Sequence, residues 1–173
     1  MFLELIGTVF AGLAAAGLIM VVNLLTGRRL PRWFTPVGAG LAMIFATISS
    51  EYSWYDRTRE KLPEGMVIVQ EVESRALYRP WTYVVPFVER FVAVDVATVR
   101  QNPSQPGHRL GDVYFFGRWA PLSKLPVLAD CSELRRANLA DGAEFDADGT
   151  ILNPDWITVS ADDPIVKAMC TEG

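Results

Sequence analysis

The stretch Phe2–Leu25, with the sequence FLELIGTVFAGLAAAGLIMVVNLL, decides the fold of this chain. Only Glu4, Thr8 and Asn23 interrupt its apolar character. A second stretch, Phe34–Ser50, consists of apolar or small residues throughout. Both are close to the roughly 17–25 residues that a helix needs to cross the hydrocarbon core of a bilayer. The sequence therefore predicts a transmembrane hairpin of two helices.

This hairpin divides the chain into three regions. We expect the helices at about 2–25 and 34–54 within residues 1–55, a charged juxtamembrane stem at 56–64, and one extramembrane domain at 65–173. A cleaved signal peptide is the alternative for the first helix. Such a peptide needs a basic segment before its apolar run, whereas here the basic residues follow it. We therefore expect the first helix to be retained as an anchor.

The extramembrane domain shows runs rich in β-branched and aromatic residues, separated by Pro and Gly, as is typical of strands. Asp130 and Glu133 resemble a capping box, which predicts a short helix over Cys131–Leu139. Pro164 predicts a last helical segment through Met169. The expected fold class is a small α+β, mostly β, domain behind a membrane hairpin. We expect strands at Met66–Val72, Trp81–Val85, Phe87–Val99, Asp112–Trp119 and Trp156–Ser160, a loop at Gln101–Arg109, and a hairpin at Phe145–Ile151 that turns at Asp148-Gly149.

The charge of the domain excludes some partners. Residues 55–173 carry 13 Lys and Arg against 18 Asp and Glu. Nucleic acid needs a basic face for its phosphates, so we expect no nucleic-acid partner. The same net charge argues against tight electrostatic docking on anionic lipid.

Basic residues also predict the orientation. The bend between the helices carries Arg28, Arg29 and Arg32. Because Lys and Arg near helix ends favour the cytoplasmic side, the bend is expected there and the domain in the periplasm. Three cations at residues 57–61 argue in the opposite direction. We expect a multi-pass protein of a bacterial inner (cytoplasmic) membrane.

The two cysteines, Cys131 and Cys170, both lie in the domain. An even pair in an exported domain predicts a disulfide, which supports the periplasmic side. Two unrelated buried thiols are the alternative. A redox-active pair is a further one, although the spacing is far from C-x-x-C.

Small residues recur at helical spacing in both apolar stretches. They are Gly12 and Ala16 in the first, and Gly38, Ala42 and Ala46 in the second. This spacing lets helix backbones approach closely in lipid. Packing of the two helices on each other and docking against helices of a larger complex are both open, and they are compatible.

Motifs that carry chemistry are weak. His108 is the single histidine and lies among Pro and Gly, so we expect a surface loop residue rather than a metal ligand or a triad member. Asp146-x-Asp148-Gly149 resembles the opening of a calcium loop, but position twelve is Ile157 instead of glutamate. Glu4 and Glu51 are expected to be solvated interfacial acids. We expect no catalytic, cofactor or metal site.

The densest aromatic run lies at residues 113–119. Tyr114, Phe116, Arg118 and Trp119 are candidate partner contacts, because aromatic and arginine side chains are enriched at protein interfaces. Burial in the core of the domain is the alternative.

Together these features predict a non-catalytic accessory or assembly subunit of a multi-subunit inner-membrane complex, respiratory or photosynthetic in type. Its helices would dock to integral membrane subunits within the lipid bilayer, and its domain would cover the periplasmic face. Two alternatives remain: a periplasmic thiol redox enzyme or sensor that uses Cys131 and Cys170, and a homo-oligomeric two-helix pore or scaffold.

Overall fold

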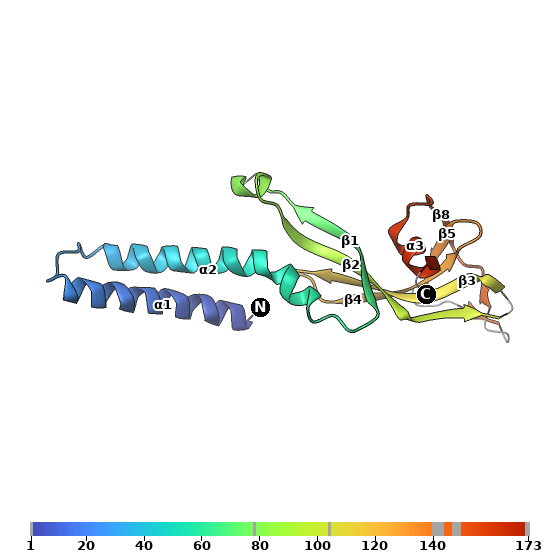
Figure 1. Ribbon diagram of the computed structural model, residues 1–173, viewed down its shortest axis with the longest axis horizontal. Coiled ribbons are helices and arrows are strands. Elements are labelled where there is room, and N and C mark those ends of the chain that lie inside the picture. The colour runs from blue at the N-terminus through green and yellow to red at the C-terminus, as the bar shows by residue number, and fades with distance from the viewer. Residues whose placement is uncertain (1, 78, 104, 140–143, 147–149, 172–173) are drawn as a thin grey trace. The chain divides into compact units, whose positions relative to one another are not determined.

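The computed structural model describes residues 2–77, 79–103, 105–139, 144–146 and 150–171. The chain forms two compact units, Met1–Thr58 and Arg59–Gly173. The first unit is helical, and the second is built on a β-sheet with one short α-helix, α3 (Figure 1). The order of two N-terminal helices followed by a mostly β unit agrees with the sequence-based prediction.

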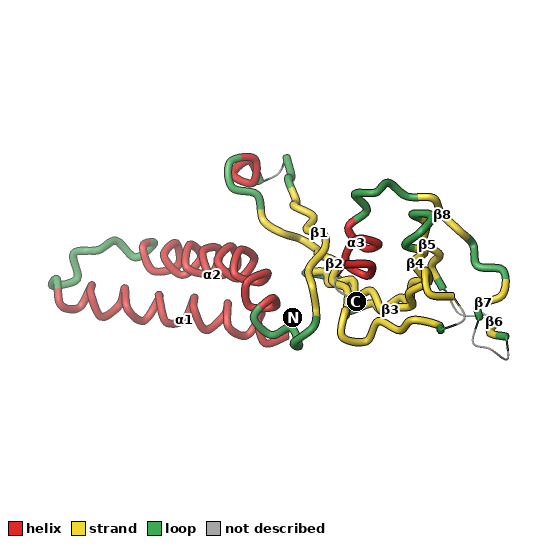
Figure 2. The backbone as a smooth tube through the Cα atoms, turned by 45° about the vertical axis from the view of Figure 1, so that its right-hand side comes forward, coloured by secondary structure: helices red, strands yellow, loops and turns green. Residues whose placement is uncertain are grey.

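The helical unit consists of α1, Phe2–Leu25, and α2, Phe34–Arg59, which run antiparallel side by side (Figures 1 and 2). The bend between them is tight because Gly27 and Arg28 take positive φ angles of 73° and 60°. The Asn23 side-chain oxygen accepts a hydrogen bond of 3.0 Å from the Leu30 amide and closes the turn.

The two helices differ in membrane character. The stretch Leu3–Leu25 of α1 is long and apolar enough to cross a membrane, and only 6% of its most apolar window is buried within the chain. The core helix of a soluble protein would be mostly buried, so the exposure of α1 suggests a membrane anchor or a signal segment. No second span is found among the described residues, and the multi-pass prediction is unsupported. Pro36 and the polar Ser49–Glu51 stretch make α2 the less apolar helix.

Close packing joins α1 to α2. A Cβ atom added to Gly12 would overlap the Met43 side chain, and one added to Gly38 would overlap Ile19. Glycine at these positions therefore lets the two helices approach, as the small-residue spacing predicts. Ala16, Ala42 and Ala46 are partly buried.

Substituting Gly12 with leucine is expected to push the helices apart, since overpacking costs roughly 1–3 kcal/mol. Gly7→Leu is the matched control, because nothing lies within 4 Å of a Cβ there. Spin labels at Leu18→Cys and Leu41→Cys would report the distance between the helices. Longer distances are expected in Gly12→Leu only; equal distances in both variants would contradict this packing.

The β unit contains an antiparallel half-barrel sheet of six strands within the described residues, in the order β1-β2-β3-β4-β5-β8. The strands are β1 Met66–Ser74, β2 Phe87–Asn102, β3 Gln105–Gly117, β4 Ser123–Asp130, β5 Arg135–Asn138 and β8 Trp156–Thr158. A separate pair joins β6, Glu144–Phe145, to β7, Ile151–Leu152, as the predicted hairpin requires. Its predicted turn at Asp148-Gly149 lies outside the described residues.

Each face of the sheet has its own core, because alternate residues of a strand point to opposite faces. On one face, Val94, Val113 and Val127 pack with Met169 of α3, Pro164–Thr171. On the other, Leu128 and Ala137 pack with Trp156 and Ile151. As predicted, α3 begins at Pro164.

The predicted helix over Cys131–Leu139 is wrong. Asp130 does accept the Ser132 and Glu133 amides, as a capping residue would. Leu134, however, takes a positive φ of 51° and reverses the chain, so β5 follows and pairs with β4.

Two other local predictions also fail. Trp81–Val85 is not a strand: Pro80–Tyr83 forms a short 3-10 helix, η1, in the loop between β1 and β2. The predicted loop Gln101–Arg109 instead continues both strands into a tight hairpin. A register shift between Gln101 and Asn102 accommodates Pro106, which cannot donate to the ladder.

Candidate functional site

A buried carboxylate, Asp130, organises the polar end of the sheet. Asp130 is the last residue of β4 and is 1% exposed. Its Oδ2 atom accepts a 2.9 Å hydrogen bond from Arg135 Nε and lies 3.4 Å from His108 Nε2. The register explains this grouping, since Asp130 is the cross-strand neighbour of both His108 on β3 and Arg135 on β5. We call these three residues the polar cluster.

The second oxygen of Asp130 holds the following turn. Oδ1 accepts hydrogen bonds from the Ser132 hydroxyl at 2.6 Å, the Ser132 amide at 3.0 Å and the Glu133 amide at 3.2 Å. Burial by itself would raise the pKa of the Asp130 carboxyl. Hydrogen bonds from Ser132, Arg135 and the two amides outweigh burial and lower that pKa below its ordinary value.

An aromatic side chain, Trp156, lies against two members of the polar cluster. The Arg135 guanidinium carbon lies 4.4 Å from the centre of the Trp156 ring, and the His108 ring centre lies 5.4 Å from it. Arg135 also makes a 2.9 Å ion pair with Glu133. These contacts hold the charges of the cluster in a fixed arrangement next to the core that contains Leu128.

The geometry of the cluster does not suit nucleophilic catalysis. A Ser-His-Asp triad needs the serine hydroxyl on the histidine. Here the Ser132 hydroxyl donates to Asp130 instead. Both His108 ring nitrogens already face partners, Nε2 toward Asp130 and Nδ1 toward Gln105 Oε1 at 2.7 Å. The hydrogen bonds and ion pairs of Asp130 instead connect β3, β4 and β5 at this end of the sheet.

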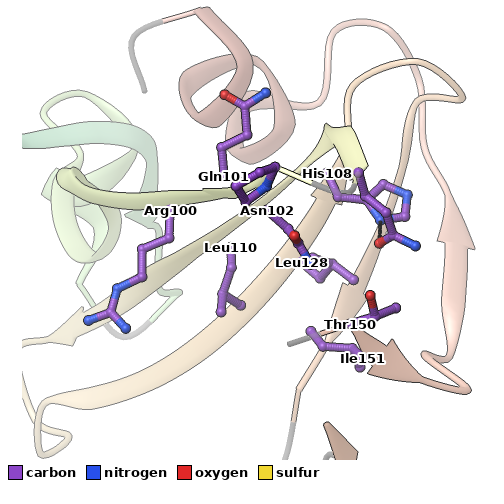
Figure 3. Close-up of a pocket in the computed structure, with 10 residues that line it drawn as sticks. Arg100, Gln101, Asn102, His108, Leu110, Leu128, Thr150 and Ile151 are labelled. Carbon is purple, nitrogen blue, oxygen red and sulfur yellow. Dashed lines mark hydrogen bonds between the residues drawn. The ribbon is translucent and has the colours of Figure 1, made fainter. Parts of the chain in front are cut away.

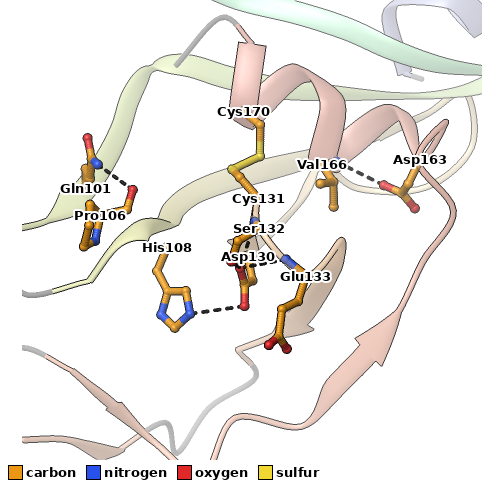
Figure 4. The surroundings of a disulfide bond; sticks show 10 residues. All are labelled: Gln101, Pro106, His108, Asp130, Cys131, Ser132, Glu133, Asp163, Val166 and Cys170. Carbon is orange, nitrogen blue, oxygen red and sulfur yellow. Dashed lines mark hydrogen bonds and ion pairs between the residues drawn. A yellow bond between two sulfur atoms is a disulfide. The ribbon is translucent and has the colours of Figure 1, made fainter.

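A disulfide lies directly beside the polar cluster. Cys131 follows Asp130 and is bonded to Cys170 of α3, with their Cα atoms 5.9 Å apart (Figure 4). At the other end of α3, Asp163 Oδ1 accepts the Ile165 and Val166 amides, each at 3.1 Å. The predicted disulfide is thus present, and it ties α3 to the end of β4.

A cavity of about 280 Å³ opens at the same end of the sheet. Leu110, Leu128 and Ile151 line its apolar part, while Arg100 and His108 lie at its edges (Figure 3). Its volume lies just below the range for ligand pockets, about 300–1,000 Å³.

His108 was expected to be a surface loop residue, and this is wrong. It lies on β3 with 21% of its side chain exposed, paired with Asp130. The sequence offers no signal for this pair, because only the register of β3 against β4 brings the two residues together. The sequence indicates a buried carboxylate only in that Asp130 ends the apolar run that begins at Leu125.

The four candidate partner contacts differ in how far their side chains are exposed. Phe116 is partly buried and stacks on the buried Phe91 with ring centres 4.7 Å apart. The centre of the Tyr114 ring lies 5.7 Å from Lys124 Nζ. Arg118 lies over Trp119, whose side chain is 54% exposed. Trp119 is thus the contact residue most open to a partner.

The charged residues of the helical unit differ in their contacts and exposure. Glu4 accepts a 3.1 Å hydrogen bond from the Ser50 hydroxyl and lies 3.9 Å from Arg57. Glu51, expected to be solvated, is buried. Arg28, Arg29 and Arg32 are exposed at the bend.

Within the residues that the structure describes, no group of three or more His, Cys, Asp and Glu could hold a metal ion. Comparison with protein-family models, curated proteins and solved structures finds no match to this chain.

Proposed function

We propose that this chain is a non-catalytic accessory or assembly subunit of a multi-subunit inner-membrane complex. The observation that carries this proposal is the apolar surface of α1, which its own chain leaves almost entirely uncovered. In a membrane, lipid and the helices of partner subunits cover such a surface. The partners are integral membrane proteins.

In this proposal α1 and α2 both cross the membrane as a hairpin. The 26 residues of α2 form a helix about 39 Å long, which exceeds the roughly 30 Å of the hydrocarbon core. Its small residues pack against α1, which shields backbone that lipid would otherwise contact. A cytoplasmic bend then satisfies the positive-inside rule for Arg28, Arg29 and Arg32.

The β unit lies in the periplasm in this proposal. The disulfide supports this location, because such bonds persist in oxidising compartments and are rare in the cytosol. The saturated hydrogen bonding of the polar cluster supports a non-catalytic role, since its serine and histidine are both committed to structure.

The test is purification of the tagged full chain from native membranes in mild detergent, followed by mass spectrometry. We expect a stoichiometric set of integral membrane proteins. Trp119→Ala should weaken their retention, because interface tryptophans contribute about 2 kcal/mol or more. Ile157→Ala, at an exposed position on β8, is the control and should retain them.

Recovery of a homo-oligomer alone would contradict the accessory role and favour the pore or scaffold. Recovery of a monomer, with oxidoreductase activity that requires both cysteines, would favour the thiol enzyme.

A further inference from the structure

The β1–β2 loop, residues 75–86, displays an apolar surface that the sheet does not use. Its exposed apolar side chains are Leu77 (87%), Trp81 (45%), Tyr83 (53%), Val84 (83%) and Val85 (55%). Among the described residues no other loop of the β unit exposes as many large apolar side chains. Exposed apolar patches of this kind mark interaction sites.

The loop has a built internal structure. The Thr82 hydroxyl accepts a 3.0 Å hydrogen bond from the Ala76 amide and donates one of 2.8 Å to the Arg79 carbonyl. Thr82 is 1% exposed. The buried threonine closes the loop from inside, while η1 directs its apolar neighbours outward. An apolar environment offers no hydrogen-bond partners, so a loop that enters one must satisfy its backbone polar groups internally.

The composition of the loop indicates which environment covers its apolar side chains. Trp and Tyr are the residues enriched at membrane–water interfaces, and arginines beside them reach lipid headgroups. The loop itself carries no acidic residue, and its Arg75 forms a 3.3 Å ion pair with Glu73 of β1. Burial of the apolar side chains, rather than charge, supplies the driving force for insertion.

Only residues 60–65 link α2 to β1, the strand that leads into the loop. We propose that the β1–β2 loop inserts its apolar side chains into the interface of the bilayer in which the helices are anchored. This inference rests on the membrane hairpin of the proposed function.

Spin labelling of the full chain tests the insertion directly. No free cysteine is found in the described structure, so an introduced cysteine can be labelled with the disulfide intact. Three single-label proteins are needed: Val84→Cys in the loop, Asp155→Cys beside β8 as the aqueous reference, and Leu13→Cys in α1 as the lipid reference. Each is reconstituted into vesicles of phosphatidylethanolamine and phosphatidylglycerol.

Collision of the label with oxygen, which concentrates in lipid, is compared with collision with a water-soluble nickel chelate. We expect the oxygen-to-nickel ratio at Val84 to be several-fold higher than at Asp155. Trp81→Glu should lower the ratio at Val84 to the aqueous value. Ile157→Glu, which places the same charge at a similarly exposed position on β8, should leave it unchanged.

The outcomes separate the two proposals. An aqueous Val84 label together with a lipid-exposed Leu13 label overturns the insertion of the loop and leaves the anchor intact. An aqueous Leu13 label overturns the membrane hairpin itself.

Discussion

Replacing both Cys131 and Cys170 with serine is expected to lower the free energy of unfolding of the β unit by about 4 kcal/mol. The bond joins residues 39 apart in the sequence, and on the chain-entropy model a loop of this length restricts the unfolded chain strongly. The bond also ties α3, with the fully buried Met169, to the end of β4. Loss of the bond therefore loosens the core that α3 forms with one face of the sheet.

Urea unfolding of the full chain in detergent, followed by hydrogen exchange of peptides from β4 and α3, measures this loss. Reduced wild type is the matched control and should resemble the double variant, which itself should not respond to reductant. A loss below 1 kcal/mol, accompanied by loss of an enzymatic activity, would instead support the thiol redox alternative.

Asp130→Asn is expected to destabilise the β unit by about 2 kcal/mol, because a neutral amide at this buried position weakens the charge-assisted hydrogen bonds that the carboxylate accepts. Arg135 would keep its ion pair with Glu133. Asp112→Asn is the matched control: Asp112 pairs with Lys124 at 2.8 Å on the surface, where an ion pair contributes at most about 1 kcal/mol. Equal losses in the two variants would contradict the anchoring role of Asp130.

The same carboxyl predicts a pH dependence. Since hydrogen bonds lower the pKa of Asp130 in the folded state, the unfolded state binds the proton more tightly. The contribution of Asp130 to stability is therefore fully present above about pH 4 and is lost as the pH falls toward the lowered folded-state pKa. Unfolding measured from pH 6 downward should show this loss in the wild type, and the Asp130 component should be missing in Asp130→Asn.

The surface pair shows a related effect of opposite sign. The hydrogen bond to Asp112 raises the pKa of Lys124, with the Asp112 charge acting in the same direction. Lys124 is exposed, so the pair is screened by solvent and serves as the reference against which the buried cluster is judged.

The helical part of the fold could be predicted from local sequence, because membrane character depends on composition along one segment. The apolar run of α1 and the glycines opposite Met43 and Ile19 follow directly from residue type and spacing. Hydropathy alone does not identify α2 as a membrane span, because its polar C-terminal half lowers its apolar character.

Within the β unit, local signals identified β1, β2 and the start of α3, where Asp163 and Pro164 combine a cap with a fixed φ angle. They failed at Asp130, whose capping contacts with Ser132 and Glu133 are the same at the start of a helix or of a turn. The positive φ of Leu134 decides between the two, and the pairing of β5 with β4 compensates the strain.

Sequence alone therefore determined the apolar N-terminal helix, the mostly β character of the second unit and the presence of two cysteines suited to a bond. Only the tertiary structure decided that His108, Asp130 and Arg135 meet beneath Trp156, and that Thr82 closes a loop which displays Trp81 and Val84. Composition and periodicity act along the chain, whereas these groupings depend on strand register between residues that are distant in sequence.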